Sequence, residues 1–155
     1  MAGRLSMGIV LYRRHHGELE VLLAHMGGPL WARKDYGAWT IPKGEPVEGE
    51  MPFATAKREF EEELGLPLPI SPPRELGSVR QSGGKTVTAW AIEGDVDPDE
   101  VRPGQFTMEW PRHSGIHRSF PEVDRVAWFG AADACARMVI AQRSFLGRLQ
   151  EMLKA

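Results

Sequence analysis

Three glutamates are spaced so that their carboxylates would lie close together on one helical face. Glu59, Glu62 and Glu63 occupy positions i, i+3 and i+4, which lie within about a third of a turn of one another on an α-helix. Three such carboxylates repel one another unless a cation neutralises them. Oxygen ligands of this kind suit Mg²⁺, or Mn²⁺, and not zinc. The spacing alone leaves two interpretations open, a metal site or an exposed acidic helix face.

The element that carries these glutamates is predicted to be a helix over residues 51–64. Its apolar side chains recur at helical spacing from Phe53 to Leu64, which is typical of a helix with one buried face. Gly65 stands where a helix end favours a left-handed residue, and Pro67 prevents continuation. The acidic side chains are therefore expected to project from a face beside the buried stripe.

Other segments predict a mixed α/β fold around this helix. Alternation of apolar residues and the placement of turn residues predict strands and helices in a fixed order. Strands are expected over 7–12, 19–24, 39–41, 75–81, 85–92 and 123–129, with 106–110 extended. Further helices are expected over 131–140 and 144–153, and long loops or irregular chain over 26–37, 95–104 and 111–121.

Length and composition exclude several classes of protein. The chain has 155 residues, 42% of them hydrophobic, and a net charge of −2, which fits one globular domain over residues 1–155. The single cysteine, Cys135, excludes an internal disulfide and favours a reducing compartment. It lies in an expected helix, where a small buried hydrophobe is the simplest reading. No apolar run approaches the roughly 20 residues of a membrane span, so a cytoplasmic protein without membrane contact is expected.

A longer motif surrounds the three glutamates. The run from Gly44 to Leu66 reads G, five residues, E, seven residues, then R-E-F-E-E-E-L-G-L. It resembles the Nudix box, G-x5-E-x7-R-E-apolar-x-E-E-x-G-apolar, at all seven fixed positions, and both apolar positions are filled. The acidic residues of the helix thus belong to a motif of 23 residues. This match favours the metal site over an exposed acidic helix face.

The resemblance implies a fold and an activity. Members of the Nudix family have an α/β/α sandwich with a mixed central sheet, in which the box forms a loop, a helix and a loop. They hydrolyse a pyrophosphate bond in a nucleoside diphosphate linked to another moiety, with Mg²⁺ as the usual cofactor. The chemistry is consistent, because a divalent cation offsets the charge of a pyrophosphate and lowers the pKa of a coordinated water.

Roles for individual residues also follow from the resemblance. Glu59 and Glu63 match metal ligands, Glu62 matches a ligand or the base that activates water, and Gly44 offers a backbone carbonyl to the metal. Arg58 matches an arginine whose role would be structural, binding nearby carboxylates such as Glu50.

A fourth acid often assists from outside the box in this family. Glu109 and Glu122 are the two candidates, since both follow the central strands. Each has an ordinary exposed surface position as its alternative. Some Nudix members use a glutamate on the strand that corresponds to 85–92, but this strand carries none here. The identity of the catalytic base therefore stays open.

The segment before the box bears on the substrate. Residues 39–44, W-T-I-P-K-G, are similar to the W-x-x-P-K-G segment of Nudix members that cleave diadenosine polyphosphates, diphosphoinositol polyphosphates or capped RNA. Lys43 could contact a phosphate, and Trp39 or Tyr36 could stack on a base; for Trp39 the alternative is a core position. Further basic candidates for phosphate binding are Arg33, Lys34, Lys85, Arg112 and Arg118.

Two other functions remain to be distinguished from hydrolysis of a small nucleotide such as a dinucleoside polyphosphate. Some Nudix modules only sense a nucleotide, although these usually lose box glutamates that this chain retains. RNA 5′-end hydrolysis is the other, but no long basic stretch interleaved with aromatic residues predicts a nucleic-acid partner.

His113 and His117 are four residues apart, yet Gly115 and nearby prolines argue against a helical metal pair. The sequence leaves monomer and homodimer equally open.

Overall fold

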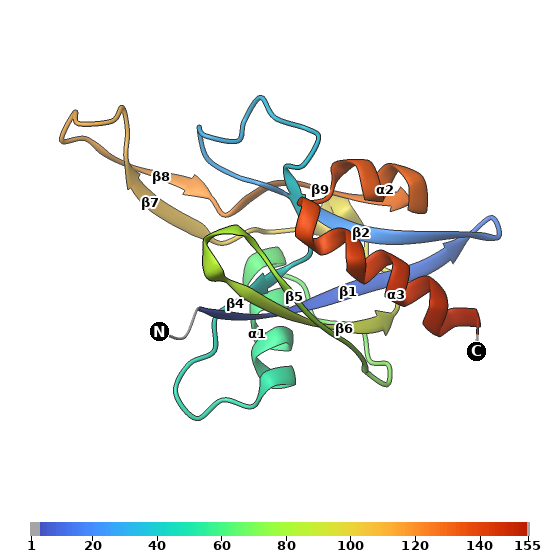
Figure 1. Ribbon diagram of the computed structural model, residues 1–155. Coiled ribbons are helices and arrows are strands. Elements are labelled where there is room, and N and C mark those ends of the chain that lie inside the picture. Colours follow the sequence, from blue (N-terminus) through green and yellow to red (C-terminus); the bar gives the residue numbers. More distant parts are fainter. Residues whose placement is uncertain (1–3, 155) are drawn as a thin grey trace.

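The first two strands form the hairpin on which the rest of the sheet is built (Figure 1). The structure, a computed structural model, describes residues 4–154. Strand β1 (Leu5–His15) turns at His16 and Gly17 into β2 (Glu18–Met26). Both turn residues have positive φ, 52° at His16 and 78° at Gly17, which is typical of a tight hairpin turn.

Further strands extend this hairpin into a seven-stranded mixed sheet. Its path is β3-β2-β1-β6-β5, with β4 paired to β1 and β9 paired to β2. The β1–β6 pair is parallel and the remaining pairs are antiparallel. The added strands are β3 (Trp39–Thr40), β4 (Lys43–Gly44), β5 (Arg74–Arg80), β6 (Thr86–Glu93) and β9 (Val123–Gly130).

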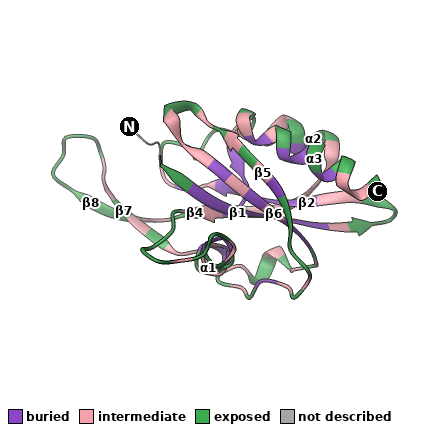
Figure 2. Ribbon diagram, turned by 60° about the horizontal axis from the view of Figure 1, so that its bottom comes forward, coloured by how far each residue is buried: buried purple, intermediate pink, exposed green. Residues whose placement is uncertain are grey.

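Helices cover both faces of the sheet, as Figure 2 shows. Helix α1 (Pro52–Leu64) lies on one face, and α2 (Ala131–Arg137) and α3 (Arg143–Lys154) lie on the other. The resulting α/β/α arrangement with a mixed sheet confirms the expected fold class.

Alternation along β1 explains why both faces are covered. Ile9 and Leu11 pack with Phe60 of α1, while Val10 and Tyr12 pack in the cluster beneath α2 and α3. Successive residues of a strand point to opposite faces, so an uninterrupted apolar run requires apolar partners on both sides.

Helix α1 begins and ends close to the residues predicted. Met51 precedes its first turn, and Gly65 follows its last residue in the left-handed conformation, with φ 66°. The amide of Gly65 donates to the carbonyl of Glu61, 2.8 Å away. A side chain at Gly65 would collide with the backbone of Arg102, so both the conformation and the space require glycine here.

The part of the chain predicted least well forms a projecting hairpin. Strand β7 (Gln105–Glu109) pairs with β8 (His117–Pro121) in a separate two-stranded sheet. This pair extends away from the main sheet (Figure 1). The expectation of irregular chain over 111–121 was wrong for its second half, because the short polar strand β8 is held by pairing with β7 and has no alternating apolar pattern of its own.

Smaller differences occur elsewhere. Helix α2 ends at Arg137, three residues before its expected end, and short 3₁₀ turns span Pro98–Glu100 and Ile140–Gln142. Cys135 is exposed, so the expectation that it is a buried hydrophobe was wrong; α2 buries the side of Ala134. Within residues 4–154, no helix is both long and apolar enough to span a membrane.

Candidate active site

Strand β4 and helix α1 bring the two ends of the box together. Gly44 is paired with Met7 of the central strand β1, which anchors the start of the box to the sheet. The carboxylate of Glu59 on α1 lies directly against Gly44, so any Cβ at that position would overlap it. Glycine at residue 44 thus allows the Glu59 carboxylate to approach the backbone closely, and a side chain here would require that carboxylate to move.

A pocket of about 400 Å³ opens where these elements meet. Its wall combines box residues with residues from the start of β6 and the start of β9. The lining residues are Met26, Thr40, Lys43, Gly44, Glu45, Glu59, Glu63, Lys85, Glu122 and Val123. Carboxylates and ammonium groups from distant parts of the sequence thus face one cavity.

Glu63 is the most deeply buried carboxylate of the pocket, with 9% of its surface exposed. The pKa of Glu63 is raised from 4.5 to about 8, chiefly by burial; Lys43 opposes the shift, and the nearby charges of Glu122 and Glu59 contribute to it. A carboxyl group in this environment is poorly stabilised as an anion unless a cation approaches.

Two other carboxyl groups of the pocket are shifted in the same direction. The pKa of Glu59 is raised chiefly by burial, although the guanidinium of Arg58 opposes the shift. The pKa of Glu122 is also raised by burial, and the charges of Glu59 and Glu62 add to it. Mutual repulsion among carboxylates from α1 and from the segment before β9 is a feature of metal and catalytic sites.

Arg58 holds the loop of the box against the helix. Its Nε donates to Glu50, 2.8 Å away, and one terminal nitrogen donates to Glu59 at 2.8 Å and to Glu62 at 3.0 Å. The guanidinium and the hydroxyl of Thr55 together lower the pKa of Glu50 to about 2. These contacts agree with a structural role for Arg58, which ties Glu50 to α1.

Glu62 occupies a different position from the other two box glutamates. Its side chain is 58% exposed and pairs with Arg58, and it does not line the pocket described above. Its charge nevertheless contributes to the raised pKa of both Glu59 and Glu122. Glu62 therefore stands at the edge of the carboxylate cluster.

The donor set fits a hard divalent cation. The pocket offers carboxylate oxygens from Glu59, Glu63 and Glu122, as Mg²⁺ or Mn²⁺ prefers. Within residues 4–154, no three acidic, histidine or cysteine side chains converge closely enough to enclose an ion by themselves. This arrangement matches Mg²⁺ sites that use one or two carboxylates and complete the coordination with water and substrate phosphates.

Two lysines face the carboxylates across the pocket. Burial lowers the pKa of Lys43, and the neighbouring ammonium of Lys85 lowers it further, whereas Glu63 and Glu59 raise it. Lys43 was expected from the sequence to contact a phosphate, whereas Lys85 was one of several basic candidates. No sequence pattern joins the two, because the parallel pairing of β1 with β6 is what brings Lys85 to the site.

Two of the predicted site residues lie elsewhere. The carboxylate of Glu109 accepts hydrogen bonds from the backbone amides of His113, at 2.9 Å, and Gly115, at 3.2 Å, and it does not line the pocket. Trp39 is 4% exposed and lies edge-on to Phe129 in the core beneath α2 and α3. Neither residue is placed to act on a ligand in this pocket, and the core alternative for Trp39 is correct.

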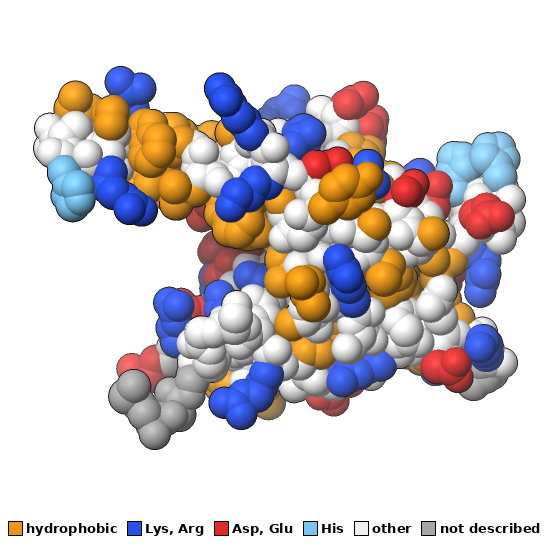
Figure 3. Space-filling view, turned by 45° about the horizontal axis from the view of Figure 1, so that its top comes forward, with side chains coloured by type: hydrophobic (Ala, Val, Ile, Leu, Met, Phe, Trp, Pro, Cys, Tyr) orange, Lys and Arg blue, Asp and Glu red, His pale blue; other side chains and the backbone are white. Residues whose placement is uncertain are grey.

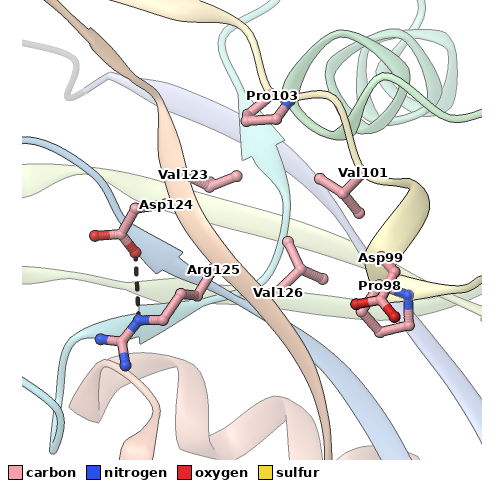
Figure 4. Close-up of a pocket in the computed structure, with 8 residues that line it drawn as sticks. All are labelled: Pro98, Asp99, Val101, Pro103, Val123, Asp124, Arg125 and Val126. Atoms are coloured by element: carbon pink, nitrogen blue, oxygen red, sulfur yellow. Dashed lines mark ion pairs between the residues drawn. The ribbon is translucent and has the colours of Figure 1, made fainter.

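A second pocket, of about 270 Å³, adjoins the first at Val123 (Figure 4). Val126 of β9 faces Val101 across it, whereas Asp124 and Arg125 lie on the other side of the strand and form an ion pair at 3.6 Å. Its walls combine proline and valine side chains with Asp99, Asp124 and Arg125, whereas the box glutamates and the two lysines line the first pocket.

Solved structures share this fold. An Ap4A hydrolase of C. elegans, solved as a binary complex, has a TM-score of 0.70 and 24% identity over 97% of this chain and 98% of its own. The NUDIX domain of Shewanella oneidensis NrtR, complexed with ADP ribose, has a TM-score of 0.68 and 18% identity, covering 99% and 90%. A Nudix hydrolase of M. smegmatis, RenU, has a TM-score of 0.64 and 20% identity, covering 99% and 88%.

At the level of sequence, the chain matches a family but no individual curated protein. No curated protein matches the chain. The sequence pattern of the NUDIX domain, in contrast, matches residues 3–149, which is nearly the whole chain and includes the box and the carboxylate pocket. The protein therefore belongs to the NUDIX domain family.

Proposed function

We propose that the protein is a Mg²⁺-dependent pyrophosphohydrolase that cleaves dinucleoside polyphosphates or related nucleotides. One observation carries the proposal: Glu59, Glu63 and Glu122 line the same pocket as Lys43 and Lys85. Carboxylates with raised pKa values need a cation, and paired ammonium groups need an anion. A magnesium-bound polyphosphate supplies both.

Each side of the pocket has a separate task in this proposal. Glu59 and Glu63, with the carbonyl of Gly44, would hold the divalent ion, which would neutralise phosphate oxygens and lower the pKa of an attacking water. Lys43 and Lys85 would bind phosphate oxygens and orient the chain of phosphates. Arg58 would act only by fixing α1 to the loop of the box through Glu50.

Glu122 is our candidate for the group that accepts the proton of the attacking water. It lines the pocket and its pKa is raised, which brings a carboxylate nearer to the range useful for a general base. Glu62 is the competing candidate from the sequence, but it is 58% exposed and bound to Arg58. Single Glu122→Gln and Glu62→Gln variants, compared by their pH-rate profiles, would separate the two.

The substrate class rests on two supporting observations. The segment from Trp39 to Gly44 keeps the W-x-x-P-K-G pattern, and Lys43 of that pattern lines the pocket. The similarity to an Ap4A hydrolase covers almost the full length of both chains, at 24% identity. The burial of Trp39 assigns that residue to the scaffold, so any base stacking must come from other aromatic side chains.

A panel of substrates with Mg²⁺ would test the proposal. It should contain diadenosine tetraphosphate and hexaphosphate, ADP-ribose, an oxidised deoxynucleoside triphosphate, a diphosphoinositol phosphate and triphosphorylated RNA. Wild type and Glu63→Gln would be assayed together, with Glu48→Gln as a matched control from the exposed loop of the box. We expect turnover of diadenosine polyphosphates that is lost only in the Glu63 variant.

The panel also distinguishes the two alternatives. A nucleotide-sensing module would bind members of the panel, measured by calorimetry, without cleaving any of them. The NUDIX domain of NrtR, which was solved with ADP ribose, makes that ligand a useful probe. An RNA 5′-end hydrolase would cleave triphosphorylated RNA in preference to every small nucleotide.

A further inference from the structure

The hairpin β7–β8 presents a ribbon whose two faces differ in chemistry. In its register, Phe106 lies opposite Phe120 and Met108 opposite Arg118. The amide of Trp110 donates to the carbonyl of Ile116 at 2.8 Å, so this pair continues the same series. Alternating residues share a face, and one face is therefore apolar with a cation.

The opposite face is small and polar. Thr107 lies opposite Ser119, with their hydroxyls 3.3 Å apart, and Glu109 lies opposite His117. Glu109, the one carboxylate between residues 105 and 121, is occupied by the two backbone amides of the turn described above. Thr107, Ser119 and Glu109 on the polar face are thus already hydrogen-bonded within the hairpin, whereas the apolar face has no assigned role.

The inner end of the apolar face is already packed. The ring of Phe106 lies against Gly28 of the loop over 27–38, close enough that a side chain at residue 28 would collide with it. Further out, Met108 and Trp110 are partly buried, Ile116 is 50% exposed and Arg118 is exposed. We call these four residues, Met108, Trp110, Ile116 and Arg118, the arm face.

The arm face is continuous with the catalytic pocket. Glu122 lies two residues beyond Phe120 and donates its amide to the carbonyl of Gly104, at 2.8 Å. Gly104 lies two residues before Phe106, and a Cβ on it would lie 3.4 Å from the carboxylate of Glu122. The hydrogen bond between Glu122 and Gly104 therefore joins a pocket-lining residue directly to the inner end of the hairpin, from which the arm face extends outward.

The charge of the arm favours an anion. Arg118 on the arm face and Arg112 at the turn are both exposed, and within residues 4–154 neither forms an ion pair. Figure 3 shows the hairpin standing clear of the body, with hydrophobic and basic side chains along it and a hollow beside it. Partly exposed aromatic side chains beside exposed cationic ones are typical of surfaces on which nucleobases stack and phosphates bind.

We infer that the arm face binds the second nucleoside of a dinucleoside polyphosphate, the half that extends out of the catalytic pocket. Trp110 stacks on its base, Ile116 and Met108 pack beside the ring, and Arg118 binds an outer phosphate. This inference rests on the proposed function and adds to it the residues that select a substrate with two nucleosides over a substrate with one.

A pair of substrates isolates this contribution. Diadenosine tetraphosphate and adenosine 5′-tetraphosphate share one nucleoside and the chain of four phosphates, and only the former has a second nucleoside. Trp110→Ala and Arg118→Ala should each raise KM for diadenosine tetraphosphate roughly tenfold, the scale of one lost base stack or phosphate contact. In Trp110→Ala, kcat and both constants for adenosine tetraphosphate should change less than about twofold. Arg118→Ala should raise KM for both substrates, because both carry the outer phosphate.

Matched variants separate binding from folding. Thr107→Ala and Ser119→Ala remove polar groups from the opposite face of the same ribbon and should behave as wild type. Trp110→Phe keeps an aromatic ring and Arg118→Lys keeps a charge, so both should recover most of the affinity. Equal effects of Trp110→Ala on the two substrates, or no effect of either alanine variant on diadenosine tetraphosphate, would overturn the inference.

Failure of the proposed function would be visible separately. If wild type cleaves neither substrate, that function is wrong, and the dissociation constant of diadenosine tetraphosphate then tests the arm by calorimetry on the same variants. Unchanged affinity in Trp110→Ala and Arg118→Ala would reject the arm as a nucleoside site. Loss of triphosphorylated RNA cleavage with unchanged diadenosine tetraphosphate kinetics would reject it in favour of an RNA-binding arm.

Discussion

At the scale of single residues, burial of Glu63 is expected to lower the stability of the metal-free protein while the same carboxylate supports turnover. Its carboxyl group is nearly inaccessible and shares the pocket with two other carboxyl groups whose pKa values are raised. Ionisation of Glu63 is therefore unfavourable in the metal-free protein, and a bound cation would offset that unfavourable free energy. A change that removes its charge should affect stability and turnover in opposite directions.

Glu63→Gln is expected to lower turnover at least about 100-fold, because a metal ligand and a unit of negative charge are lost together. The same change should stabilise the metal-free protein near pH 8 by on the order of 2 kcal/mol, since an unfavourable buried charge is removed. Steady-state kinetics and urea unfolding in EDTA would measure both effects. Near-normal turnover would contradict the ligand role of Glu63.

Gly44→Ala tests the close approach of Glu59 to the backbone. The new Cβ would overlap the Glu59 carboxylate, so that carboxylate must rotate out of the pocket. We expect weaker Mg²⁺ activation, seen as a rise in the Mg²⁺ concentration needed for half-maximal turnover, with the fold retained. Gly130→Ala is the control, because nothing lies within 4 Å of its Cβ position; equal Mg²⁺ dependence in both variants would contradict the argument.

At the scale of elements, His25 joins three segments around the pocket. The side chain is fully buried at the end of β2. Its Nδ1 lies 2.7 Å from the carboxylate of Asp124 at the start of β9, and its Nε2 lies 2.5 Å from the carbonyl of Lys34 in the loop over 27–38, which follows β2. The neighbours of His25 and Asp124 in sequence, Met26 and Val123, both line the pocket.

His25→Ala should destabilise the protein by about 2 kcal/mol, because two buried hydrogen bonds are lost and polar partners remain unsatisfied. Urea unfolding monitored by tryptophan fluorescence would measure the change. His15→Ala, in an exposed part of the first hairpin, should change stability by less than about 0.5 kcal/mol. Similar values for the two variants would show that the loop over 27–38 is held by other contacts.

At the scale of the whole molecule, the carboxylate pocket links stability to pH and, under the proposed function, to Mg²⁺. The pKa of Glu63 in the folded protein, about 8, lies above its ordinary value of 4.5. Between these two values the folded state binds more protons than the unfolded state, so stability falls as pH rises through this window. Below pH 4.5 this penalty is absent, and above pH 8 it is complete.

The melting temperature in EDTA should therefore decrease from pH 5 to pH 8, and Mg²⁺ should raise it more at pH 8 than at pH 6, since ligand carboxyl groups must ionise to bind the cation. Differential scanning fluorimetry across this range would measure both trends. In Glu63→Gln the decrease should be shallower. A Mg²⁺ effect that is independent of pH would contradict the coupling between ionisation and metal binding.

Much of the architecture was predictable because local patterns carry it. The apolar stripe from Phe53 to Leu64, followed by Gly65, determines α1 almost to the residue, and the uninterrupted apolar run in β1 requires helices on both faces. The second half of the segment over 111–121 was not predictable, since β8 exists only through its pairing with β7.

The residues of the site likewise fall into those that could be predicted from the sequence and those that could not. The family, the box and the spacing of Glu59, Glu62 and Glu63 could be predicted from the sequence, because these features depend on residues that are close together along the chain. The folded structure was needed to show that Lys85 and Glu122 line the pocket, that Glu109 supports a turn and that Trp39 belongs to the core. Those outcomes depend on strand pairing between distant segments and on which face each residue presents, and no local pattern specifies either.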